Sequence, residues 1–134
     1  MRIRILLLFF GLSSPLLFGR VQKGTSVRVD GLYRPALATV NRFLHAWQTQ
    51  DHETGIMMLT DAARQSVSLD QLQSFFSPGA DAAFEIRRGR RLKEAEYAFR
   101  VVLFDSSNSP TRPQFCTIIV VRAGKDEWAV DKLP

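Results

Sequence analysis

Cysteine and histidine are scarce in this 134-residue sequence, which has one cysteine, Cys116, and two histidines. A single thiol cannot form a disulfide within the chain, so a folded domain must be stabilised by core packing. One cysteine also excludes zinc sites built from cysteine pairs. Cys116 lies in an apolar run, which is typical of a buried structural cysteine rather than of a nucleophile.

Common catalytic signatures are missing as well. The sequence has no Gly-rich phosphate loop, no His-Glu-x-x-His and no Gly-x-Ser-x-Gly elbow. These absences exclude enzymes that depend on such motifs, but not enzymes whose acid and base are scattered along the chain. With 46% apolar and 23% charged residues, the composition is that of an ordinary globular protein, and the length suits one domain.

The sequence contains one long hydrophobic run, residues 5–18, which follows Arg2 and Arg4. A helix of this length reaches only about 21 Å, against roughly 30 Å of membrane hydrocarbon, and Pro15 interrupts it. The pattern predicts a signal peptide over residues 1–19, with an uncleaved anchor as the alternative. We therefore expect an exported protein, periplasmic or secreted, that is held at a membrane only if the leader is retained.

Basic residues outnumber acidic ones by 18 to 13, and five of them fall in the seven positions from Arg87 to Lys93. One interpretation is a surface that binds anions such as nucleic acid, acidic glycans or lipid head groups. The other is a solvated hairpin end with Glu94 and Glu96 as charge partners. No aromatic side chains interleave with the run, so nucleic acid is the less favoured partner.

Beyond a flexible lead-in at residues 20–33, the patterns predict one domain over residues 34–134. A helix from Pro35 to about Gln50 carries one apolar stripe, and two short helices follow, capped by Asp51 and Ser68, with residues 60–67 as a connection or an irregular helical turn. From residue 84 onward, alternating apolar residues predict about four antiparallel strands. The predicted fold class is α+β, with N-terminal helices packed on one face of a curved antiparallel sheet.

The two longest predicted strands, residues 97–104 and 115–122, are apolar on both faces. Helices can cover only one face of a sheet, so the other face needs a second cover. Self-association through the outer sheet face is the simplest cover, which predicts a homodimer.

This layout resembles the nuclear-transport-factor-2-like, or cystatin-like, superfamily of α+β cones, and in particular its small exported bacterial members of uncharacterised function. The resemblance spans residues 34–134 and rests on Phe43-Leu44-x-Ala46-Trp47, on Gln50-Asp51 and on the terminal Glu127-Trp128-Ala-Val-Asp131. It implies a pocket at the open end of a cone and frequent dimerisation by sheet packing. Enzymatic relatives include ketosteroid isomerases and scytalone dehydratases, but none of their catalytic motifs matches here, so no catalytic residue is predicted.

The predicted ligand-binding residues are those expected inside the cone, and the expected ligand is small and either apolar or acidic. Aromatic residues at these spacings also suit a plain core. Arg88 lies two residues after Ile86 and four after Phe84, so in a regular strand it would point inward with them, unless the register slips by one residue. The predicted set is Phe43, Trp47, Arg88, Tyr97 and Phe99.

No cofactor and no metal is predicted. On the helical wheel His45 lies away from the apolar stripe, and His52 stands beside Asp51 and Glu53 at a helix start, where solvated residues are common. Nothing in the sequence directs these four side chains toward one point.

The leading hypothesis is an exported, non-catalytic ligand-pocket or protein-interaction domain of the cell envelope. The first alternative is a cofactor-independent enzyme of the isomerase or dehydratase kind, using a buried Asp or Tyr. The second is an anionic-surface binder that acts through the basic run from Arg87 to Lys93.

Overall fold

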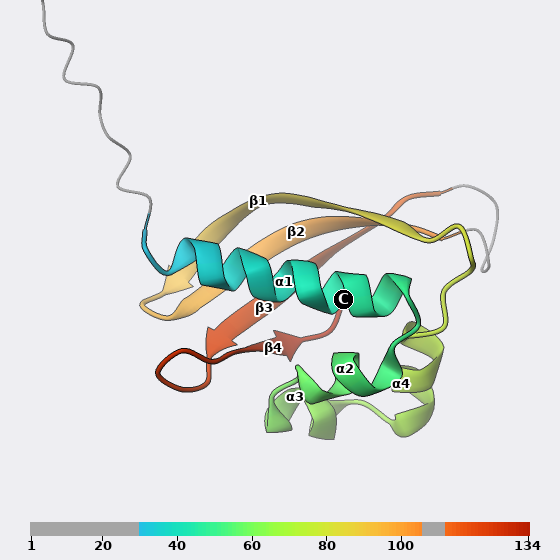
Figure 1. The fold of residues 1–134 in the computed structure, drawn as a ribbon, viewed down its shortest axis with the longest axis horizontal. Coiled ribbons are helices and arrows are strands. Elements are labelled where there is room, and N and C mark those ends of the chain that lie inside the picture. The colour runs from blue at the N-terminus through green and yellow to red at the C-terminus, as the bar shows by residue number, and fades with distance from the viewer. Residues whose placement is uncertain (1–29, 106–111) are drawn as a thin grey trace, which may run out of the picture.

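A computed structural model describes residues 30–105 and 112–134 of the chain. The predicted signal peptide, most of the predicted lead-in and loop residues 106–111 lie outside the described residues. Four helices are followed by four strands, which confirms the predicted α+β class (Figure 1). The elements are α1 (Tyr33–Gln48), α2 (His52–Met57), α3 (Asp61–Ser66), α4 (Leu69–Phe75), β1 (Ala83–Lys93), β2 (Glu96–Phe104), β3 (Gln114–Arg122) and β4 (Trp128–Lys132).

Helix α1 lies along the concave face of the sheet, which curves around it (Figure 1). Its start is fixed by Asp30, whose carboxylate accepts a hydrogen bond from the Leu32 backbone N–H at 3.2 Å and whose carbonyl accepts one from Tyr33 at 2.8 Å. None of the helices in the described ranges is long and apolar enough to cross a membrane. One face of α1 is buried, as the apolar stripe predicts: Ala36, Thr39, Val40, Phe43, Leu44, Ala46 and Trp47.

The three short helices close one end of the molecule below the C-terminal end of α1 (Figure 1). The Asp51 side chain caps α2, and Ser68 and Gln71 form the predicted capping box on α4. Of the two alternatives for residues 60–67, a connection or a helical turn, the structure has the helical one, α3, because the Thr60 hydroxyl accepts a hydrogen bond from the Ala63 backbone at 3.0 Å and starts the turn.

The strands form an antiparallel meander in the order β1-β2-β3-β4. Backbone hydrogen bonds also tie the α2–α3 connection to β4: Thr60 donates to the Val130 carbonyl at 2.9 Å, and Val130 donates to Met58 at 2.8 Å. This short parallel bridge, Leu59 to Val130, anchors the helical end to the last strand.

A bulge in β1 changes which side chains face inward. Ile86 pairs with Val101, but the next inward pair is Gly89 with Phe99, so the alternation shifts between them. A Cβ atom at Gly89 would lie 2.3 Å from the Phe99 ring, so a residue with a side chain would clash at this position. The expected inward direction of Arg88 is therefore not observed: the bulge leaves it exposed on the outer face.

The two faces of the sheet differ in character. The inner face packs against α1 and is fully buried at residues such as Phe99, Ile118 and Val120. The outer face is apolar in places, with Val102 buried, but it also carries several arginines. A two-fold dimer through this face would bring the arginines of two copies together, and the homodimer stays a prediction.

Trp47→Ala tests the packing of α1 on the sheet. The ring is 3% exposed, so its removal should lower the free energy of unfolding by about 3–5 kcal/mol, measured by urea denaturation. As a control, Leu69→Ala removes a side chain that is 64% exposed and should change stability by less than about 0.5 kcal/mol. An unchanged midpoint for Trp47→Ala would contradict the packing of this helix.

Candidate functional site

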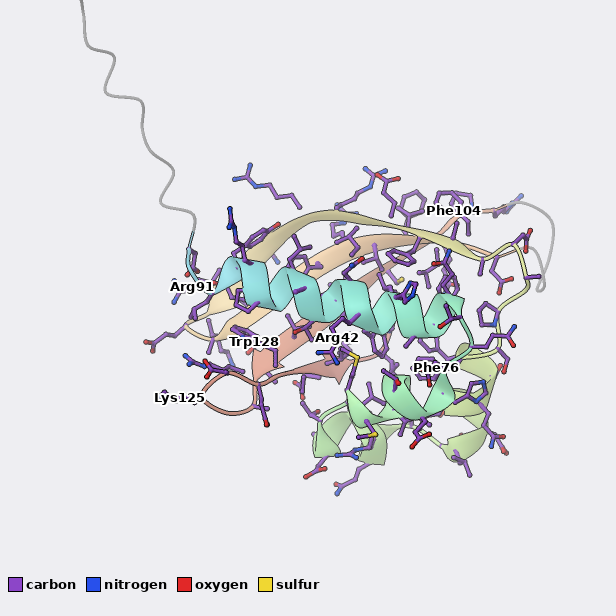
Figure 2. The ribbon with its side chains drawn as sticks, viewed as in Figure 1. Arg42, Phe76, Arg91, Phe104, Lys125 and Trp128 are labelled. Atoms are coloured by element: carbon purple, nitrogen blue, oxygen red, sulfur yellow. The ribbon has the colours of Figure 1, made fainter. Side chains whose placement is uncertain are left out.

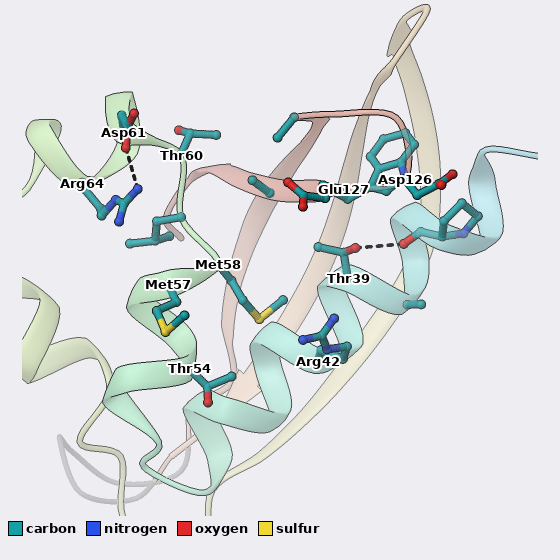
Figure 3. Close-up of a pocket in the computed structure, with 16 residues that line it drawn as sticks. Thr39, Arg42, Thr54, Met57, Met58, Thr60, Asp61, Arg64, Asp126 and Glu127 are labelled. Atoms are coloured by element: carbon teal, nitrogen blue, oxygen red, sulfur yellow. Dashed lines mark hydrogen bonds and ion pairs between the residues drawn. The ribbon is translucent and has the colours of Figure 1, made fainter.

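A groove of about 880 Å³ lies between α1, the α2–α3 connection and the turn from β3 to β4 (Figure 3). Residues from three separate parts of the chain line it, and the bridge from Leu59 to Val130 holds two of these parts together. Its volume is within the usual range for small-molecule sites, roughly 300–1,000 Å³.

The groove has an apolar part made by methionine and tryptophan. Met58 is buried, Trp128 is half-buried, and Met57 is 72% exposed. Thr39 also contributes, and its hydroxyl donates to the Pro35 carbonyl at 2.9 Å within the same helix. Methionine side chains adapt to ligands of different shape, so this surface suits an apolar ligand body.

Charged side chains surround the apolar part. Arg64 and Asp61 form an ion pair at 2.5 Å on α3, and Asp126 and Glu127 stand at the opposite side (Figure 3). Arg42, on α1, is exposed and has no carboxylate within ion-pair distance among the described residues. Figure 2 shows it on the side of α1 that faces β4 and the short helices. Arg42 is thus the cation of the groove that can pair with a ligand.

Four of the five sequence-predicted ligand residues lie in the cone interior, where they are buried: Phe43, Trp47, Tyr97 and Phe99. Other aromatic rings fill the space around them. Phe43 stacks on Phe75 with ring centroids 6.0 Å apart, Trp47 lies 6.4 Å from Phe75, and Tyr97 lies 6.4 Å from Phe99. None of the four lines the groove.

Arg88, the fifth predicted residue, lies on the other side of the sheet. It lines a shallow concavity on the outer face together with Arg90 and Arg100. The structure therefore separates Arg88 from the four aromatic residues by the thickness of the sheet. Ligand contact by these five residues stays a prediction.

Tyr97 lies on β2, and its hydroxyl reaches Asp30 just before the start of α1. Its hydroxyl donates to the Asp30 carboxylate, which also lies 3.3 Å from Arg91. Burial, followed by the hydrogen bond to Asp30, raises the pKa of Tyr97 to about 12. The hydrogen bond from Tyr97, followed by that from the Leu32 backbone, lowers the pKa of Asp30. Asp30 belongs to the segment expected to be a flexible lead-in, yet it joins α1 to the sheet.

Neither histidine lines the groove. His45 is exposed, and His52 lies 3.4 Å from the Ser77 hydroxyl. Among the described residues, no three His, Cys, Asp or Glu side chains gather closely enough to hold a metal ion.

Cys116 is half-buried on β3, and burial raises the pKa of its thiol to about 11. Little reactive thiolate is therefore present near neutral pH.

The groove was not predicted from the sequence, although one signal for it exists. Pro35, Ala38, Thr39 and Arg42 recur at helical spacing and form a second stripe on α1 beside the buried one. The other groove residues come from the α2–α3 segment and from the turn between β3 and β4, which the Leu59–Val130 bridge brings together. No local sequence pattern predicts that these two distant segments lie side by side.

Comparison with known proteins supports the architecture. No protein-family model and no curated protein matches the chain. Among solved structures, a ketosteroid isomerase-like protein from Erwinia carotovora atroseptica matches with a TM-score of 0.55 and 15% identity, over 77% of this chain and 93% of that one. An uncharacterised cystatin-fold protein from Novosphingobium aromaticivorans matches with a TM-score of 0.50 and 16% identity, over 74% and 97%.

The chain therefore has the nuclear-transport-factor-2-like, cystatin-like α+β cone fold, which confirms the fold that the sequence resemblance implied. At these identities the likeness concerns the fold alone and does not transfer an activity.

The Asp30–Tyr97 contact predicts a stability that falls at both pH extremes. Because the folded-state pKa of Asp30 is lowered, its stabilising contribution is present above the unfolded value of about 3.9 and is lost as the pH falls through the folded value. Because the pKa of Tyr97 is raised to about 12, its contribution is lost as the pH rises from about 10. Unfolding free energies measured across pH should show both slopes.

Variants separate this contact from the general effect of acid and base. Asp30→Asn should reduce the slope on the acid side, and Tyr97→Phe should reduce the slope on the alkaline side. Asp81→Asn is the control, because it removes an exposed carboxylate that has no hydrogen bond to the described residues. If Asp30→Asn and Asp81→Asn have the same acid slope as the unmodified chain, Asp30 makes no special contribution.

Proposed function

We propose that this protein is an exported, non-catalytic domain of the cell envelope that binds a small ligand in the groove beside α1. The ligand has an apolar body, which lies on Met57, Met58 and Trp128, and an anionic group, which pairs with Arg42. The observation that carries the proposal is the Arg42 guanidinium, which has no ion-pair partner among the described residues and stands at the edge of an apolar surface in an open groove of about 880 Å³.

The filled cone interior supports a binding domain over an enzyme. Cone enzymes need an acid, a histidine or a tyrosine that meets the substrate in a shielded site. Among the described residues the buried ones are apolar apart from Thr39 and Tyr97. The Tyr97 hydroxyl already donates its proton to Asp30, and its pKa of about 12 makes it a weak acid at neutral pH. The isomerase or dehydratase alternative therefore lacks an available proton donor in the described interior.

The sulfonated dye 8-anilinonaphthalene-1-sulfonate is a suitable probe, because it combines an apolar body with an anion. We expect it to bind with a stoichiometry of one, measured by fluorescence titration of the full chain. Arg42→Ala should weaken binding by about fivefold, since an exposed charge pair contributes at most about 1 kcal/mol.

Arg34→Ala is the matched control, because it removes an exposed arginine from the same helix without changing the groove. Equal weakening by the two variants would mean that the dye responds to the net charge of the protein. Binding that is independent of Arg42 would place the ligand elsewhere and would overturn the proposal. Circular dichroism of both variants checks that the fold is retained.

Export has its own test, because it rests on the basic and apolar pattern of residues 1–19. Mass spectrometry of the protein recovered outside the cytoplasm should give a chain that begins after Gly19. An intact Met1 in that species would replace cleavage by a retained anchor. Recovery of the protein in the cytoplasm alone would contradict export.

A further inference from the structure

The outer face of the sheet carries a group of arginines that the groove does not use. A shallow concavity of about 490 Å³ on this face is lined by Arg88, Arg90, Arg100, Ala98 and Thr117. A smaller one of about 140 Å³ shares Arg100 and Thr117 with it and adds Arg87 and Phe115. The two concavities are therefore continuous, and we call the surface formed by Arg87, Arg88, Arg90, Arg100 and Thr117 the arginine face.

The arginine face results from the bulge in β1. Without the bulge, Arg87 and Arg88 would point to opposite sides of the sheet, because neighbouring residues alternate in a regular strand. With it, Arg88 lines the same concavity as Arg90, whose partner across the ladder is Ala98. Arg100 joins them from β2, two residues along the same face from Ala98.

The basic run of the sequence and the arginine face are not the same set of residues. Arg91 turns toward the start of α1, where it pairs with Asp30 at 3.3 Å, and Lys93 lies at the hairpin end beside Glu96. Arg100, by contrast, lies outside the run and belongs to the face.

Positive charge on this face is almost uncompensated. Arg87 has one distant partner, Glu85, at 3.9 Å. Arg88, Arg90 and Arg100 have no carboxylate within 4.0 Å among the residues that the structure describes. Guanidinium groups pair best with phosphate or carboxylate, which they can hold with two parallel hydrogen bonds.

Two exposed aromatic rings, Phe104 and Phe115, lie on the same face of the sheet as the arginines. Phe115 is 64% exposed and lies under the Arg87 guanidinium, 5.9 Å from its ring centroid, and Phe104 is 40% exposed. Figure 2 shows Phe104 at the end of the sheet opposite to Arg91. Cationic groups beside exposed phenylalanines are typical of proteins that lie on the surface of an anionic bilayer, with the rings at the boundary of the acyl chains.

We propose that the arginine face binds the phosphate head groups of an anionic lipid bilayer. A second copy of the chain is the weaker occupant, because two-fold packing would oppose like charges. A soluble polyanion would use the arginines but would leave Phe104 and Phe115 in water. The bilayer uses both features of the face.

The test is sedimentation of the full chain with vesicles of 30% phosphatidylglycerol and 70% phosphatidylcholine, against vesicles of phosphatidylcholine alone. The apolar leader contributes equally to all variants, so the comparison between variants isolates the arginine face. Each basic residue near an anionic surface contributes about a fivefold factor to binding. The triple variant Arg88→Ala/Arg90→Ala/Arg100→Ala should therefore bind the anionic vesicles roughly 100-fold more weakly at low salt, and 1 M salt should remove the difference because it shortens the screening length to about 3 Å.

The control variant Arg34→Ala/Lys93→Ala/Lys125→Ala removes the same charge from positions outside the arginine face. It should bind anionic vesicles far more tightly than the first triple variant. Equal loss in both would show attraction by net charge and would overturn the proposal. Two other results would also overturn it: binding of heparin but not of vesicles, and a dimer in light scattering that the first triple variant strengthens. The dye titration with Arg42 uses a separate surface, so each proposal can fail without the other.

Discussion

The contact between the buried face of α1 and the concave face of the sheet is the constraint on which the rest of this structure depends. Phe43 and Trp47 are covered by the strands and by α4, and the inner residues of β2 and β3 are covered by α1. The apolar face of each layer is shielded from water only by the other layer, since a single helix or a one-layer sheet exposes its apolar side. The short helices then only have to close the end of an existing core.

The filling of this core determines where ligands can bind. The sequence resemblance led us to expect a pocket at the open end of a cone, but the aromatic rings of Phe43, Phe75, Phe76 and Tyr97 pack in the interior. Both binding surfaces that we propose therefore lie on the outside of the layers. One is the flank of α1, where Arg42 is available. The other is the outer side of the sheet, where the arginines gather.

Much of the fold could be predicted from the sequence because its signals are local. The apolar stripe of α1, the Ser68–Gln71 capping box and the alternation along β2 are all set by neighbours within a few residues. The sites could not be predicted in the same way. The groove requires the Leu59–Val130 bridge, whose partners are far apart in sequence.

The bulge at Arg87 and Arg88 shows how a small departure from regularity can redistribute charge. Counted without residues 1–19, the chain has a net charge of only +3, which as a total favours no particular partner. One extra residue in β1, fixed by the close approach of Gly89 to Phe99, moves Arg88 from the interior to the outer face. In the inward register the Arg88 guanidinium would be buried without a charge partner, which would cost folding free energy. The same glycine that protects the packing of Phe99 therefore also creates the most basic surface of the described sheet.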